Sequence, residues 1–160
     1  MKTVKQWGTV ALGLVFFVAL IGGCAILKGI IFDKGTSKLP FVAQGFLQPE
    51  ERQEVENYIK SVTGSLVSFN KTSTACASNQ DQHCRTEALR KLYHALEFEP
   101  PATANRAKTL HHEIRDSVAQ LLNVNERAEA GERTQALSDD VTAAVARFSA
   151  AYDAWVKAVT

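Results

Sequence analysis

The stretch "LSDDVTAAVARFSAAYDAWVKA", residues 137–158, decides the fold. Its apolar residues recur at alternating spacings of four and three, which is the repeat of helices that pack nearly antiparallel. The residues of this stripe are Leu137, Val141, Ala144, Phe148, Ala151, Trp155 and Ala158. The stretch is also rich in alanine, the strongest helix former. It therefore predicts a long helix whose large side chains, Phe148 and Trp155, belong to a helical core rather than to a ligand platform.

A second amphipathic helix is predicted over about 49 to 70. Pro49 suits the first turn of a helix, and Glu50 and Glu51 suit the positive end of the helix dipole. The apolar residues with helical spacing are Val55, Tyr58, Ile59, Val62, Leu66 and Phe69. After this stripe, a polar stretch from Asn70 to Cys84 interrupts the pattern.

Two more helices are predicted between these. One covers about 81 to 97, where Pro100 and Pro101 discourage continuation. Its apolar side carries Leu89, Leu92, Tyr93 and Leu96. The other begins at Thr103 or Asn105 and reaches about 129, before a break at Gly131. Its apolar face carries Ala107, Leu110, Ile114, Val118 and Leu121.

No period-two run or Asn-Gly hairpin signal follows residue 33, so a sheet is not expected. The fold class predicted is all-α, an antiparallel bundle of about four helices behind an N-terminal membrane or signal helix. We divide the chain into a signal peptide or membrane anchor (1–32), a tether and docking segment (33–48) and a helical bundle domain (49–160).

The composition excludes one class of partner. The chain has 160 residues, 46% of them apolar and 22% charged, and a formal net charge of +1. Nucleic-acid binding requires local positive charge to neutralise phosphates. With no basic excess and no Lys/Arg cluster, no nucleic-acid partner is expected.

The N-terminus carries the most specific signal. "MKTVKQW" supplies two lysines, "GTVALGLVFFVAL" is an uncharged apolar run, and "IGGC" ends it, which is the order of a secretory signal. Ile21, Gly22, Gly23 and Cys24 resemble the lipobox of bacterial lipoprotein precursors, over about the first 24 residues. The resemblance implies that Cys24 receives a diacylglyceryl group and that cleavage before it creates a lipidated N-terminus.

An uncleaved membrane anchor is the alternative. The stretch "AILKGIIF" after Cys24 stays apolar except for Lys28, whereas such lipoproteins usually continue into a polar tether. Trp7 to Leu27 is long enough to span the hydrocarbon core of a bilayer, and Lys2 and Lys5 would keep the N-terminus cytoplasmic. Both interpretations place residues from about 33 onward outside the cytoplasmic membrane.

The stretch "CASNQDQHC", residues 76–84, has three possible meanings. In an oxidising compartment a pair of cysteines is normally a disulfide, so we predict one between Cys76 and Cys84 that joins the first two bundle helices. A metal site and a reactive thiol beside His83 remain alternatives. The spacing of the two cysteines differs from that of zinc knuckles.

No catalytic motif is found, so no enzyme activity, metal or cofactor is predicted. The nearest approach is "LHHEIRD", where adjacent His111 and His112 project about 100° apart on a helix and do not naturally share a metal. We interpret both as solvated, with His112 able to pair with Asp116 at i,i+4. Glu97 and Glu99 are interpreted as loop charges rather than as paired catalytic acids.

The sequence therefore favours a membrane-tethered, exported protein that serves as an interaction or accessory component of the bacterial cell envelope. The expected partners are the membrane and an envelope protein, with the C-terminal domain periplasmic or extracellular. A sensory module that binds a small ligand between its helices is the alternative, and an enzyme is the third class.

Overall fold

The computed structural model describes residues 41–42 and 47–160. Four α-helices and one 3-10 helix account for most of them, and this part of the chain contains no strand. The elements are α3 (Pro49–Ser78), α4 (Gln82–Ala95), η1 (Ala102–Ala107), α5 (Lys108–Glu129) and α6 (Gln135–Val159). The predicted all-α fold with four bundle helices is thus confirmed, while the expected signal or membrane helix lies outside the described residues.

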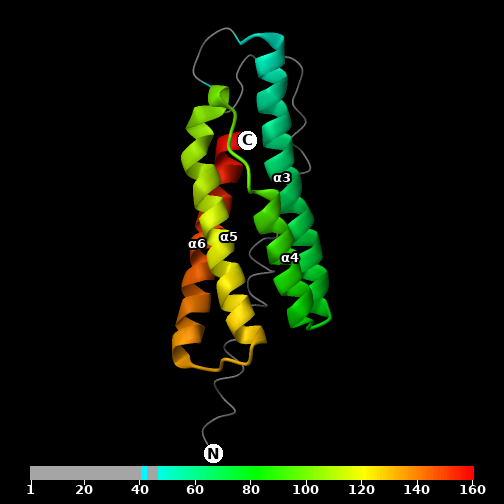
Figure 1. Ribbon diagram of the computed structural model, residues 1–160, viewed down its shortest axis with the longest axis vertical. Helices are drawn as coiled ribbons and strands as arrows, with labels where there is room; N and C mark the ends of the chain where they lie inside the picture. The colour runs from blue at the N-terminus through cyan, green and yellow to red at the C-terminus, as the bar shows by residue number, and fades with distance from the viewer. Residues whose placement is uncertain (1–40, 43–46) are drawn as a thin grey trace, which may run out of the picture.

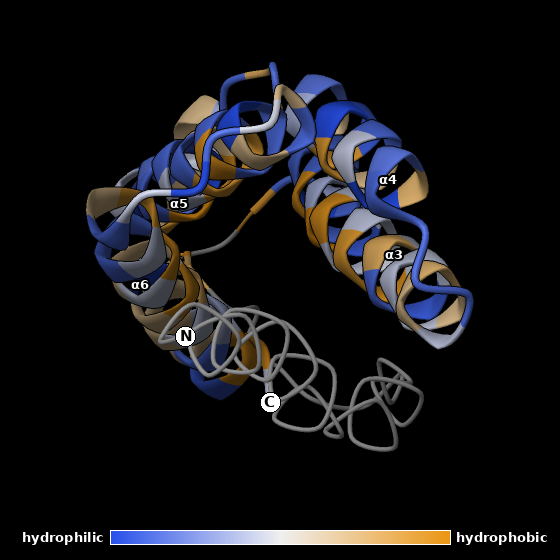
Figure 2. Cartoon of the chain, turned by 90° about the horizontal axis from the view of Figure 1, so that it is seen from below, coloured by the Kyte–Doolittle hydropathy of each residue, from blue (hydrophilic) through white to orange (hydrophobic). Residues whose placement is uncertain are grey.

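Consecutive helices run antiparallel, and each packs against the next along the chain (Figure 1). Viewed along their axes, the helices form an arc with α3 at one end and α6 at the other (Figure 2). Long aromatic side chains connect these two ends across the core. The rings of Phe69 and Phe148 lie 5.9 Å apart, and Nε1 of Trp155 donates to Oγ1 of Thr63 at 3.2 Å.

Helix α3 is longer than predicted, because its buried face continues through the polar stretch. Ser73 and Cys76 occupy the positions at which the apolar stripe would recur, and both are buried. The hydroxyl of Thr74 donates to the carbonyl of Asn70 at 2.8 Å, so side-chain polarity is satisfied inside the helix. The prediction that the helix ends near residue 70 was therefore wrong. The predicted start is right, and the Glu51 carboxylate there accepts from the backbone N–H of Gln48 at 2.9 Å.

The connection between α4 and α5 also differs in detail from the expectation. Helix α4 ends at Ala95, two residues earlier than predicted, and the chain then passes Pro100 and Pro101. The region expected to open the third bundle helix forms η1, with the non-helical residue Ala104 inside it. Helix α5 then continues to Glu129, as predicted.

Helix α6 follows its predicted apolar stripe closely. The hydroxyl of Thr134 accepts from the backbone N–H of Leu137 at 3.1 Å and so caps the first turn. Gly131, with a φ of 95°, makes the preceding break, because such backbone is easily adopted only by glycine. Phe148 and Trp155 are buried, as predicted, but Val159 rather than Ala158 takes the last core position.

The segment before α3 contacts the core where it is described. The ring of Phe41 lies 5.2 Å from that of Trp155, and Phe41 and Val42 pack against the buried cluster. These contacts place Phe41 and Val42 on the core beside α6.

Candidate functional site at the disulfide end

The turn between α3 and α4 is closed by a disulfide between Cys76 and Cys84, whose Cα atoms lie 5.5 Å apart. Cys76 is buried in the last turns of α3, and Cys84 lies in the first turn of α4. Only residues 79–81 separate the two helices, so most of the stretch expected to form a loop is helical. The disulfide therefore joins two helix ends, at the connection where the sequence places it.

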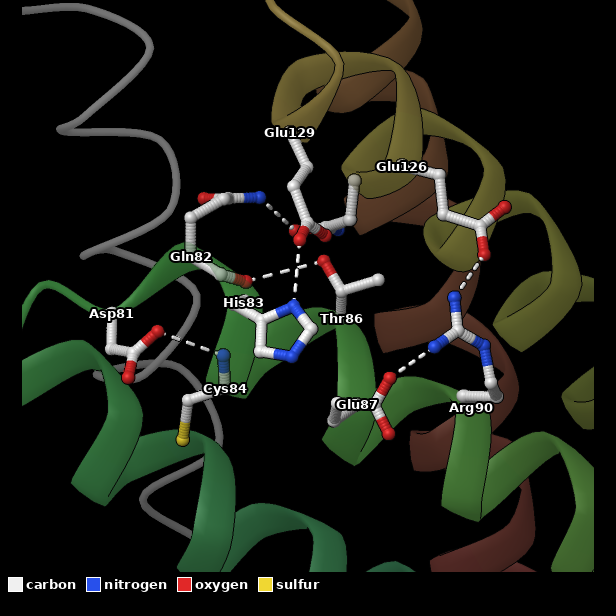
Figure 3. A network of polar contacts seen from close by, with 10 residues as sticks. Asp81, Gln82, His83, Cys84, Thr86, Glu87, Arg90, Glu126 and Glu129 are labelled. Carbon is white, nitrogen blue, oxygen red and sulfur yellow. Dashed lines mark hydrogen bonds and ion pairs between the residues drawn. The ribbon is translucent and has the colours of Figure 1, made fainter.

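Helix α4 begins with polar contacts on both sides of this turn (Figure 3). The Asp81 carboxylate caps the helix by accepting from the backbone N–H of Cys84 at 2.9 Å. Gln82 donates from Nε2 to Oδ1 of Asn125 in α5 at 2.9 Å. The first turn of α4 is thus held covalently to α3 and through hydrogen bonds to α5.

Two ion pairs extend the α4–α5 junction. Nδ1 of His83 lies 2.7 Å from Oε1 of Glu129, and Nη2 of Arg90 lies 2.6 Å from Oε1 of Glu126 (Figure 3). Arg90 also pairs with Glu87 one turn earlier in α4. We call the exposed surface formed by His83, Glu87, Arg90, Glu126 and Glu129 the α4–α5 polar surface.

The partners on this surface shift one another's protonation. The hydrogen bond with Glu129, followed by the negative charge of that carboxylate, raises the pKa of His83. Hydrogen bonds from His83 and Thr86 lower the pKa of Glu129. The pair therefore favours the charged form of both side chains, although solvent screens such an exposed interaction.

A second cluster holds the neighbouring turn between α5 and α6. Arg127 donates from Nε and Nη2 to the two carboxylate oxygens of Glu132 at 2.8 Å each, and from Nη1 to Asp140 at 2.7 Å. The hydrogen bonds from Arg127 and Thr134 lower the pKa of Glu132 to about 2. Both turns at this end of the bundle are therefore tied by fixed polar contacts.

These groups hold helices together and present charge. The two sulfur atoms are joined to each other, and His83 engages a carboxylate rather than a nucleophile. Within residues 41–42 and 47–160, no group of three or more His, Cys, Asp or Glu side chains is placed to hold a metal ion.

His111 is the residue that the sequence interpretation placed wrongly. It is fully buried rather than solvated, and its ring lies 5.1 Å from that of Phe98 and 5.8 Å from that of Tyr58. Nε2 lies 3.0 Å from the carbonyl oxygen of Leu96, and Nδ1 lies 3.1 Å from the hydroxyl of Tyr58. Burial is the main cause that lowers the pKa of this histidine.

One signal in the sequence could have identified this position. Ala107, His111, Ile114, Val118 and Leu121 follow the same spacings of four and three that define α6. His111 thus continues the apolar stripe, and Leu110, which we had assigned to it, is only partly buried.

The remaining histidines and loop acids pair with each other near the surface. His112 contacts Glu99 at 3.3 Å instead of Asp116, and His94 contacts Glu97 at 2.9 Å. Glu99 also lies 3.7 Å from Lys108. Glu97 and Glu99 therefore act as loop charges with basic partners.

Cys24 and the predicted anchor from Trp7 to Leu27 lie outside the described residues. None of the helices between Pro49 and Val159 combines the length and apolar character needed to cross a bilayer. Comparison with protein-family models, with curated proteins and with solved structures gave no match for this chain.

Proposed function

We propose that the chain is an exported, membrane-tethered helical bundle that serves as an interaction or accessory component of the bacterial cell envelope. The observation that carries this proposal is the Cys76–Cys84 disulfide between α3 and α4. Disulfides form and persist in oxidising compartments, outside the cytoplasm. The signal-like N-terminus and its lipobox at Cys24 point to the same side of the membrane.

Each histidine makes a contact within the bundle. The chain has four histidines, and each has a partner within the protein. Those partners are Glu129 for His83, Glu97 for His94, Tyr58 and Leu96 for His111, and Glu99 for His112.

The α4–α5 polar surface is the part of the bundle that best suits an envelope protein partner. Its charged side chains are exposed, yet they are held by contacts between α4 and α5. The first turn of α4 is itself fixed to α3 by the disulfide and to α5 by Gln82. Charges held in place in this way favour orientation and specificity in an encounter more than affinity.

Photocrosslinking in intact cells tests this function. A benzophenone amino acid replaces Lys91, which is exposed one turn beyond Glu87 in α4, and a control variant carries it at Lys71, which is exposed in α3. We expect the Lys91 probe to capture one envelope protein reproducibly and the Lys71 probe to capture much less of it. Equal capture at both positions, or capture of cytoplasmic proteins alone, would refute the assignment.

A separate measurement addresses export. A C-terminal tag on the full chain should be digested when protease is added to spheroplasts, and it should fractionate with membranes. A tag that is protected until the cells are lysed would contradict export. Ligand-dependent melting without a protein partner would instead favour the small-ligand module.

A further inference from the structure

The two helices at the ends of the arc each have a flank that no described helix covers. Among the described residues, α3 packs on the shorter α4 over its C-terminal half (Figure 1), and α6 packs along its length on α5. Only long side chains bridge α3 and α6, including Trp155 to Thr63 and Phe148 to Phe69. Figure 2 shows these helices at opposite ends of the arc, with apolar residues along its inner side.

The uncovered flank of α6 carries valines. Arg147 and Asp140 face α5, since they pair with Glu113 and Arg127 there. With 3.6 residues per turn, Val145 and Val156 lie on nearly the opposite side of α6. Both are partly buried and pack against the core.

The uncovered flank of α3 has the same character. Cys76 marks the side that faces α4, because it is bridged to Cys84. Val67 lies nine residues earlier, or about half a turn around the helix from Cys76, and is also partly buried against the core. We call the surface between Val67 and the two valines of α6 the α3–α6 side.

The chain enters the described structure beside this surface. Phe41 rests against Trp155 of α6, and residues 1–40 precede it. Eight residues, 33–40, all but Leu39 polar or turn-forming, separate Phe41 from the apolar stretch "AILKGIIF". Eight extended residues reach about 26 Å, and the rise from Val145 to Trp155 is about 15 Å, so the stretch can lie along the α3–α6 side.

The apolar stretch also has the pattern that this surface requires. In a helix, Ile26, Leu27, Ile30 and Ile31 share one half of the circumference, and Lys28 and Phe32 lie on the other half. We propose that residues 25–32 pack against the α3–α6 side as an additional, amphipathic helix, with their isoleucines and leucine against Val67, Val145 and Val156. This placement rests on the proposed cleavage and lipidation at Cys24, because an uncleaved anchor from Trp7 to Leu27 would hold Ile26 and Leu27 in the bilayer.

The contact would determine how the bundle sits on the membrane. Residues 25–32 directly follow Cys24, the residue at which cleavage and lipidation are proposed. Packing them on the bundle turns the α3–α6 side toward the bilayer, so that the α4–α5 polar surface on the far side of the arc faces outward. Residues 25–32 would therefore fix the orientation of the domain on the membrane, which a flexible tether would not do.

Crosslinking in intact cells with the full chain tests the placement. A benzophenone amino acid replaces Val156, and the control variant carries it at Ala150, which is exposed on another side of α6. We expect a monomeric product in which Val156 is joined to a peptide from residues 25–32, at a yield several-fold above that of Ala150.

Other outcomes would overturn the proposal. A dimeric product would assign the surface to a second copy, a product with another protein would assign it to a partner, and a lipid product would assign it to the bilayer. A yield equal to that of Ala150 would show that nothing packs there. If the Val156 variant is not exported, the same probe at Val145 or Val67 gives the test from the other positions.

Discussion

The hydroxyl of Tyr58 in α3 donates a hydrogen bond to Nδ1 of His111 in α5 over 3.1 Å. Nε2 carries a hydrogen, because the carbonyl oxygen of Leu96 can only accept. Burial lowers the pKa of His111, so Nδ1 has no hydrogen at neutral pH and accepts from Tyr58. His111 is therefore neutral and joins α3, α5 and the end of α4 inside an aromatic cluster. A second proton on the ring would occupy the position to which Tyr58 now donates.

This arrangement predicts a loss of stability at mildly acidic pH. Burial lowers the pKa of His111 below its ordinary 6.5, so the unfolded chain binds the proton more readily than the folded chain. Stability then falls as the pH drops below about 6.5 and levels off below the folded pKa. Thermal melting of the full chain between about pH 7.5 and pH 5 should therefore show a falling Tm, in a window where most carboxylates stay ionised.

Two histidine variants separate this effect from other titrations. Glu99, His112 and Arg115 also influence the pKa of His111 and remain in both variants. His111→Gln should flatten the pH slope even if its Tm is lower throughout. His83→Gln should steepen the slope, because the raised pKa of His83 adds stability below about 6.5 that is lost at higher pH. An unchanged slope in His111→Gln, or a His111 ring that titrates above 6.5 by NMR, would contradict the account.

Thr63→Val should destabilise the bundle although it conserves the size of the side chain. Nε1 of the buried Trp155 donates to the Thr63 hydroxyl, and valine leaves that donor without its acceptor. The expected loss is about 1 to 3 kcal/mol in the free energy of unfolding, measured by chemical denaturation. Thr72→Val, at an exposed position of the same helix, is the control and should change little.

Phe148→Ala tests the stripe in α6 that decides the fold. Phe148 is buried and packs edge-to-face against Phe69 of α3, at 5.9 Å between ring centres. Denaturant unfolding should show a loss of about 3 to 5 kcal/mol, which is usual for removal of a buried aromatic ring. A change below about 1 kcal/mol would mean that the ring lies outside the core.

The disulfide should block both thiols of Cys76 and Cys84 in the exported protein. Without reduction neither should react with an alkylating reagent, and after reduction both should become reactive together. Replacing both cysteines with serine should lower the free energy of unfolding by about 2 to 3 kcal/mol, on the chain-entropy account of a short closed loop. Circular dichroism should still show a helical protein, because apolar packing across four helices forms the core. Thiols that react without reduction would contradict the disulfide and favour the alternatives, a metal site or a reactive thiol.

Periodicity predicted most of the bundle, because apolar spacing alone specifies which helix face is buried. The prediction for the stripe of α6 needed no other information, whereas the start of α3 was predicted from Pro49, Glu50 and Glu51. The end of α3 could not be read in this way, since Ser73 and Cys76 continue its buried face with small, weakly apolar groups. Burial there depends on the disulfide partner in α4, which the local pattern does not contain.

The contacts of polar residues inside the core were the main feature that the sequence did not predict. The partners of His111, Tyr58 and the carbonyl of Leu96, are 53 and 15 residues away in sequence. Similarly, the contacts of His83 and Arg90 with α5 depend on how far the helices are rotated and shifted against each other. Such contacts follow from tertiary packing and are not encoded by any short motif.

The most direct test of the central claim is the intact mass of the full chain purified from bacterial membranes. The account predicts a membrane-bound protein that lacks residues 1–23, carries acyl groups on Cys24 and contains a disulfide between Cys76 and Cys84. Retention of Lys2 and Lys5 in the membrane fraction would replace the lipid with a membrane-spanning anchor. A cytosolic protein with an intact N-terminus and three free thiols would contradict an exported, membrane-tethered bundle.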